Sequence, residues 1–156
     1  MKFEIEDLIK IVIFPFIVFI FSYTLAIFNV YDFYLWLNRF AHFLGGLGMA
    51  ISGYYILNLA KRAGYLKINR ILIDAALIVF FVMTAAVVWE FYEYLSDVYL
   101  FTHSQPNVAD VIKDQFMGML GAVFFAIGLL VSKISLIRRP SVQIQAEKIK
   151  IKTAVK

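Results

Sequence analysis

The sequence predicts an all-α polytopic membrane protein, a bundle of four transmembrane helices, and three observations lead to this fold class. Of 156 residues, 62% are hydrophobic and 17% are charged, whereas soluble domains average about 45–50% apolar and 25% charged residues. The mean hydropathy is +0.80. The charged residues are separated by four long uncharged segments. Because a soluble fold of this length cannot bury so much apolar surface, we expect a lipid bilayer to surround the chain.

The four uncharged segments set the expected spans. They lie between Lys10 and Asp32, Arg39 and Lys61, Asp74 and Glu90, and Asp114 and Lys133. The first two hold 21 residues each, and a helix of that length reaches about 30 Å, the thickness of the hydrocarbon core. We expect spans at about residues 10–31, 36–60, 71–94 and 110–132, within a transmembrane domain of residues 1–138.

Residues 139–156 are expected to form a basic cytoplasmic tail. Apolar and polar residues alternate in it from Val142, a pattern that suits a short strand or a segment on the membrane surface. A frayed tail is an equal alternative.

Lysine and arginine residues predict the orientation. With the N-terminus inside, thirteen of them lie in inner segments and only Arg39 and Lys113 lie outside. Since cytoplasmic segments carry the excess of basic residues, we expect a cell-membrane protein with both termini in the cytoplasm. The net charge of +4 follows from this asymmetry, so no nucleic-acid partner is expected, and the basic inner face favours anionic lipid.

The third span is too short to be purely apolar. Only 15 uncharged residues separate Asp74 from Glu90, whereas a span needs about 20. Counted from Asp74, Glu90 lies about 24 Å across the membrane. His42 and Asp114 each lie nineteen residues from the lysine at the inner end of their span, which places both near the same depth. Three helices therefore bring titratable groups to one outward-facing layer.

Ionisable groups at such depth face the bundle interior and mark functional sites. The sequence predicts a polar site with Glu90 or Glu93 as the general base and with substrate-binding roles for Arg39, Asp97 and Lys113. A divalent cation is the candidate cofactor, because imidazole and carboxylates from neighbouring helices can surround a metal. The absence of cysteine excludes thiolate ligands. The candidate metal ligands are His42, Glu90, Glu93, Asp110 and Asp114.

Other interpretations of these residues stay open. The polar residues can form a structural salt-bridge network, in a non-enzymatic membrane binding or assembly subunit, with Arg39 and Lys113 neutralising some of the acids. Movement of ions or protons is a third hypothesis, although the inner halves of the spans hold few polar groups. Asn107, three residues before Asp110, is typical of a helix N-cap, which would give Asp110 a structural role.

Small residues predict close helix packing. The fourth span contains Gly118-x-x-x-Ala122-x-x-x-Ala126, and the second is rich in glycine. Such stripes let helix backbones approach closely. A homo-oligomer through these Gly/Ala faces is a further expectation.

Three motifs carry a family resemblance: Asn38-Arg39-Phe40-Ala41-His42-Phe43, Glu90-Phe91-Tyr92-Glu93 and Asp110-x-x-x-Asp114-x-x-x-Gly118-x-x-Gly121-Ala122. Over about residues 32–130 the chain resembles small VanZ-like and YjdF-like integral membrane proteins. The resemblance implies an envelope-associated protein, one branch of which is linked to glycopeptide-antibiotic tolerance. Together with the polar layer, it predicts metal-assisted chemistry on, or binding of, an envelope or lipid-linked substrate.

Overall fold

A computed structural model describes residues 4–68, 70–102, 105 and 107–154, and this part of the chain folds into helices and turns without a strand. The helices are α1 (Ile5–Ile27), α2 (Val30–Phe33), α3 (Leu35–Arg62), α4 (Ile71–Leu100) and α5 (Val108–Ala154). Four segments are long and apolar enough to cross a membrane, namely α1, Trp36–Arg62 of α3, α4, and Val108–Lys133 of α5. The predicted fold class is therefore confirmed.

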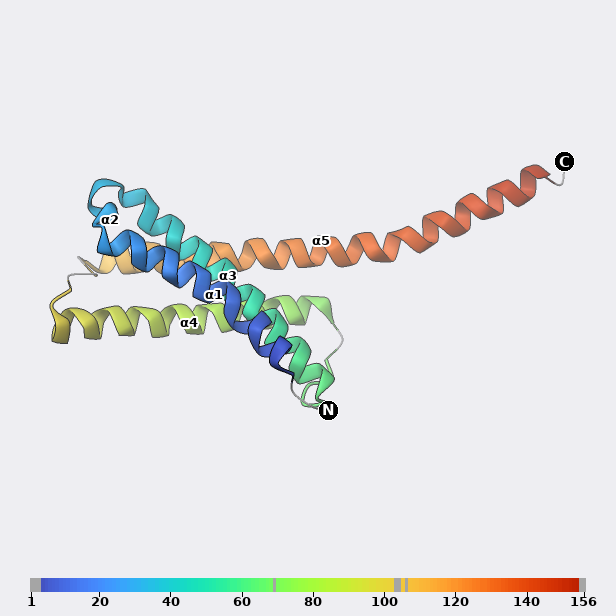
Figure 1. The fold of residues 1–156 in the computed structure, drawn as a ribbon. Coiled ribbons are helices and arrows are strands. Elements are labelled where there is room, and N and C mark those ends of the chain that lie inside the picture. The colour runs from blue at the N-terminus through green and yellow to red at the C-terminus, as the bar shows by residue number, and fades with distance from the viewer. Residues whose placement is uncertain (1–3, 69, 103–104, 106, 155–156) are drawn as a thin grey trace.

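Helix α3 is the centre of the bundle. It packs against α1, α4 and α5, and Figure 1 shows α1 and α3 lying side by side and crossing α4 and α5 obliquely. The short helix α2 joins α1 to α3 at the end where α4 finishes and α5 begins, here called the α2 end. The N-terminus and the turn between α3 and α4 lie at the opposite end, here called the N-terminal end.

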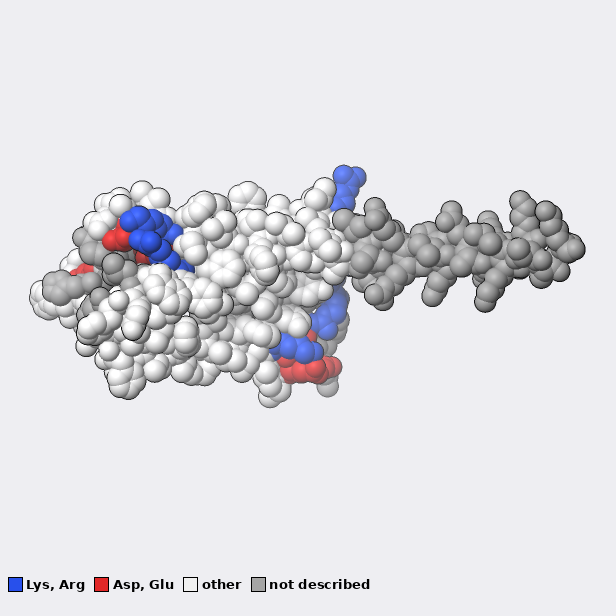
Figure 2. All heavy atoms as spheres, turned by 90° about the horizontal axis from the view of Figure 1, so that it is seen from above, with Lys and Arg blue, Asp and Glu red and all other residues white. Residues whose placement is uncertain are grey.

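Charged residues concentrate at the two ends of the bundle. On the face shown in Figure 2, Lys, Arg, Asp and Glu gather toward the ends and a broad uncharged surface lies between them. At the N-terminal end, Lys61 Nζ lies 2.5 Å from Asp74 Oδ1, which joins α3 to α4. Arg62 also pairs with Asp7, which joins α3 to α1. Many large apolar side chains are exposed between these ends, as expected for a surface that contacts lipid.

Several helix boundaries differ from the predicted ones, among them the start of α1 at Ile5 and the end of α4 at Leu100. Helix α1 ends at Ile27 rather than near residue 31, because Asn29 adopts a left-handed conformation with φ 53°, which terminates a helix. Helix α5 continues unbroken to Ala154, and Figure 1 shows it extending past the other helices. The strand alternative for the tail is therefore wrong for residues 139–154. Alanine, glutamine, glutamate and lysine in this segment favour helix over strand.

A hydrogen bond between α1 and α3 compensates for a proline. Pro15 lies inside α1 and has no N–H to donate to the carbonyl of Ile11, four residues earlier. The buried Ser52 of α3 donates its hydroxyl to that same carbonyl, with an Oγ–O distance of 2.5 Å. A hydrogen bond therefore joins α1 to α3 at the position where Pro15 removes a backbone hydrogen bond within α1.

This arrangement predicts a non-additive pair of substitutions. We expect Ser52→Ala to lower the free energy of unfolding by about 1 kcal/mol, the upper range for interhelical hydrogen bonds in membranes. In a Pro15→Ala background the same change should cost much less, because the new backbone N–H can bond the Ile11 carbonyl. Unfolding of the four proteins in bicelles measures the coupling. Equal costs in both backgrounds would contradict the assignment.

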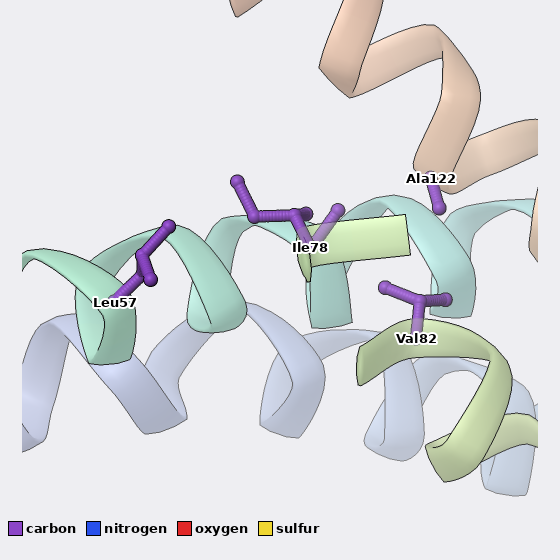
Figure 3. Packing of buried hydrophobic residues seen from close by; sticks show 5 residues of the cluster. Leu57, Ile78, Val82 and Ala122 are labelled. Atoms are coloured by element: carbon purple, nitrogen blue, oxygen red, sulfur yellow. The ribbon is translucent and has the colours of Figure 1, made fainter. Parts of the chain in front are cut away.

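The apolar core lies between α3, α4 and α5. Figure 3 shows side chains of this core from the three helices, namely Leu57 of α3, Ile78 and Val82 of α4, and Ala122 of α5. Ile78 and Val82 are each 1% exposed, and Ala122 is fully buried. The centre of the bundle is thus packed by side chains from three spans, whereas α1 contributes no buried residue.

Helices α3 and α5 approach each other through glycine. A Cβ atom added at Gly46 would lie 2.0 Å from the carbonyl oxygen of Gly118. One added at Gly121 would lie 2.2 Å from the carbonyl oxygen of Phe43. The predicted close approach is therefore confirmed, and it occurs within one chain. A homo-oligomer through the Gly/Ala faces stays a prediction, and much of the α5 stripe is already buried inside the bundle.

Candidate functional site

At the α2 end, a histidine of α3 meets an aspartate of α5. His42 Nε2 lies 3.6 Å from Asp114 Oδ2. Asn38 donates its side-chain amide to the same oxygen, with an Nδ2–Oδ2 distance of 3.1 Å. Asn38 and His42 are one helical turn apart, so both reach α5 from one face of α3. Asp114 is 8% exposed, which makes it a buried carboxyl group held by two side chains of the neighbouring helix.

Helix α4 adds a second buried carboxyl group. Glu90 is 7% exposed, and Gln105, from the loop between α4 and α5, donates its amide to Glu90 Oε2 at 2.8 Å. Glu90 lies close enough to Asp114 for the two carboxylates to interact electrostatically. We call these residues the polar cluster, in which Asp114 contacts two side chains of α3 and interacts with the α4 carboxyl group through charge. Its members are Asn38, His42, Glu90 and Asp114.

A layer of small residues lies one turn farther from the α2 end. Gly46 follows His42 by four residues, and Gly118 follows Asp114 by four. Helix α4 runs in the opposite direction, and there Ala86 precedes Glu90 by four. A Cβ atom added at Gly46 would collide with the Gly118 backbone, and one added at Gly118 would lie 4.0 Å from Ala86 Cβ. This layer is therefore tightly packed. Because the backbones approach closely in this layer, the polar side chains one turn nearer the α2 end can meet.

Glu93 lies beside the polar cluster with a partner of its own. Trp89 donates its indole N–H to Glu93 Oε1 at 2.9 Å. The Trp89 ring also makes an edge contact with Phe19 of α1, with ring centroids 6.1 Å apart. Glu93 is close enough to Glu90 and Asp114 for electrostatic interaction. Its carboxyl group is thus oriented by an aromatic residue on the α1 side.

Asp110 has the structural role that its spacing from Asn107 predicted. Its backbone N–H donates to Asn107 Oδ1 at 3.1 Å, and the Asn107 amide donates to Asp110 Oδ2 at 2.8 Å. These reciprocal bonds cap the start of α5. Lys113 donates to the other oxygen of Asp110 at 3.1 Å. The N-cap interpretation is therefore confirmed, and Asp110 and Lys113 are partners on one helix.

The remaining predicted binding residues lie around the cluster. Asp97 accepts a hydrogen bond from Thr102 Oγ1 at 2.6 Å and one from the Gln105 backbone N–H at 2.8 Å. Arg39 is exposed, and its charge interacts with Asp114. Substrate-binding roles for Arg39, Asp97 and Lys113 stay predictions.

The proposed metal ligands are distributed among different partners. Among the residues whose positions the structure describes, no three His, Asp or Glu side chains are grouped so that they could hold a metal ion. His42 pairs with Asp114, while the other three bond to Gln105, Trp89 and Lys113. Metal ligation by His42, Glu90, Glu93, Asp110 and Asp114 stays a prediction that this geometry does not support.

Sequence reasoning missed several residues that contact the acids, among them Trp89, Thr102 and Gln105. Trp89 lies four residues before Glu93, a spacing at which helical side chains meet, so this pair could have been recognised. Gln105 lies fifteen residues after Glu90 in a loop. No local spacing connects it with that carboxyl group.

Comparison with known proteins places the chain in a family. No curated protein and no solved structure matches it. One protein family matches residues 1–133. The match supports a small membrane-protein family, and it does not specify a VanZ-like or YjdF-like one. The match covers most of the chain and all four candidate spans, so the chain belongs to the family described as "Predicted membrane protein (DUF2238)".

Proposed function

We propose that this integral membrane protein binds the polar part of an envelope or lipid-linked molecule at the polar cluster, with His42 and Asp114 acting as an acid–base pair. The single observation that carries the proposal is the contact between the half-buried His42 and the buried Asp114 from facing spans, 3.6 Å apart. Ionisable groups inside a membrane are costly and are kept where they serve a function.

The chemistry follows from the partners of each group. Asn38 holds the Asp114 carboxyl group, and Asp114 in turn orients His42 through Nε2. The second ring nitrogen of His42 can then exchange a proton with a bound ligand. A separation of 3.6 Å is longer than a hydrogen bond, and such contacts often shorten when a ligand binds. Glu90 or Glu93 supplies a second base beside the pair.

The substrate class and the orientation rest on the sequence. The VanZ-like and YjdF-like motifs support an envelope or lipid-linked ligand. The excess of basic residues in the segments at the other end of the spans supports an outward-facing cluster, with both termini in the cytoplasm.

Ligand retention tests the proposal. The protein in nanodiscs is incubated with a polar lipid extract containing a polyprenyl-diphosphate sugar, and native mass spectrometry identifies the retained species. We expect His42→Ala and Asp114→Asn each to lower retention of the same species by about tenfold or more, the effect of losing roughly 1.4 kcal/mol. The double variant should lose little more, because the two residues act as a unit.

Asp74→Asn is the control, since it removes a carboxylate at the opposite end of the bundle, where its partner is Lys61. It should leave retention unchanged. If the parent and all variants retain the same species and differ only in melting temperature, the cluster is a structural network and the proposal is wrong.

A further inference from the structure

We infer that Gln105 is a positioning residue that fixes the orientation of the Glu90 carboxyl group; its importance for ligand binding rests on the proposed function. The side-chain amide of Gln105 donates to two oxygens of the same residue, Glu90 Oε2 at 2.8 Å and the Glu90 main-chain oxygen at 2.9 Å. One amide group therefore links the carboxyl end of this side chain to its own backbone. This double contact restricts the rotation of Glu90.

Gln105 is itself held in place by α4. Its backbone N–H donates to Asp97 Oδ2 at 2.8 Å, and Thr102 donates to Asp97 Oδ1 at 2.6 Å. Both oxygens of Asp97 thus bind the loop that carries Gln105. Asp97 lies seven residues after Glu90, which is two turns along the same helix face. The same face of α4 therefore carries the Glu90 carboxyl group and Asp97, which holds the Gln105 that donates to it.

The charges around Glu90 explain why a neutral donor is placed here. The nearby acids Asp114 and Glu93 interact with Glu90 electrostatically, and a carboxylate has no proton to donate. An amide satisfies a Glu90 oxygen without adding charge. Gln105→Glu keeps the size of the side chain and replaces this donor with a third neighbouring acid. It is therefore a sharper test than truncation.

Carbodiimide labelling measures the orientation without any ligand. Dicyclohexylcarbodiimide partitions into membranes and modifies carboxyl groups, and peptide mass spectrometry gives the rate at each residue. We expect Gln105→Ala and Gln105→Glu to change the labelling rate of Glu90 by about fivefold, the factor expected for one lost hydrogen bond. Asp74, which pairs with Lys61 at the N-terminal end of the bundle, is the internal control and should keep its rate.

Two further variants locate the effect. Asp97→Ala should alter Glu90 labelling in the same direction as Gln105→Ala, because it releases the loop. Asn107→Ala, which weakens only the cap of α5, should not. Unchanged Glu90 labelling in both Gln105 variants would overturn the inference. An equal change at Asp74 would also overturn it, because it would indicate general loosening of the bundle.

The outcomes separate this inference from the proposed function. If the Gln105 variants alter Glu90 labelling and His42→Ala keeps its ligand, Gln105 positions Glu90 and the proposed function fails. If His42→Ala loses the ligand and Glu90 labelling is unaffected by Gln105, the function stands and the positioning role is wrong. If both hold, Gln105→Glu should lower ligand retention while the melting temperature stays within a few degrees of the parent.

Discussion

Gly46→Ala and Gly121→Ala are each expected to lower the free energy of unfolding by about 2 kcal/mol or more, the upper part of the range for overpacking. A methyl group at either position would meet backbone atoms, 2.0 Å from the Gly118 oxygen and 2.2 Å from the Phe43 oxygen. A flexible side chain could turn away from a new methyl group, but these carbonyl groups belong to helix backbones. The helices must therefore separate, and the packing around the contact must change with them.

Two other glycines provide matched controls. An added Cβ at Gly45 or Gly128 has nothing within 4 Å. Because glycine is about 1 kcal/mol less favourable than alanine in a helix, Gly45→Ala and Gly128→Ala should be neutral or stabilising. Reversible unfolding in mixed micelles compares the four variants. If Gly46→Ala behaves like Gly45→Ala, the close crossing of α3 and α5 is wrong.

Ile78→Ala is expected to lower the free energy of unfolding by about 2 kcal/mol or more, as for other large-to-small changes in packed cores. Ile78 is 1% exposed and lies in the cluster with Val82 and Ala122. In lipid the loss does not come from contact with water. It comes from the packing contacts that an internal cavity removes.

Phe80→Ala distinguishes this explanation from simple loss of apolar surface. Phe80 lies two residues from Ile78 on the same helix and is 69% exposed. Its removal deletes more carbon atoms, yet lipid chains can fill the space, so we expect a change within about 0.5 kcal/mol, as for surface substitutions. Measured in bicelles, a larger loss for Phe80→Ala than for Ile78→Ala would show that apolar area rather than packing stabilises the bundle.

The spans were predictable because charge is expensive in hydrocarbon. Each long uncharged segment of the sequence lies largely within one apolar helix. The exact ends were less predictable. Asn29 terminates α1 through a left-handed backbone conformation, and asparagine adopts this conformation only in some contexts. The alternation after Val142 suited a short strand or a segment on the membrane surface, with a frayed tail as an equal alternative, and in the structure the helix-forming residues there allow α5 to continue.

For the candidate site, the sequence predicted a common depth for the titratable residues, but it only partly predicted which residues contact one another. The count of residues along the spans predicted one layer for His42, Glu90 and Asp114. In the structure His42 contacts Asp114, whereas Glu90 contacts Gln105 and interacts with Asp114 only through charge. Helical spacing does not reveal which acid pairs with which donor. Gln105 and Glu90 lie fifteen residues apart in the sequence and meet only in the folded chain. Such a contact is set by tertiary structure and leaves no periodic pattern in the sequence.

The layer of small residues next to the polar cluster determines which face of each of three helices points into the bundle. His42 and Gly46, Asp114 and Gly118, and Ala86 and Glu90 are each separated by four residues. Since a helix turns about 100° per residue, one residue inserted within such an interval would rotate the polar side chain away from its partners while the small residue kept its contact. The same insertion in the turn between α3 and α4 would shift neither layer. We therefore expect the chain to tolerate a change of length in the turn between α3 and α4, whereas within these short intervals the count of residues matters as much as their identity.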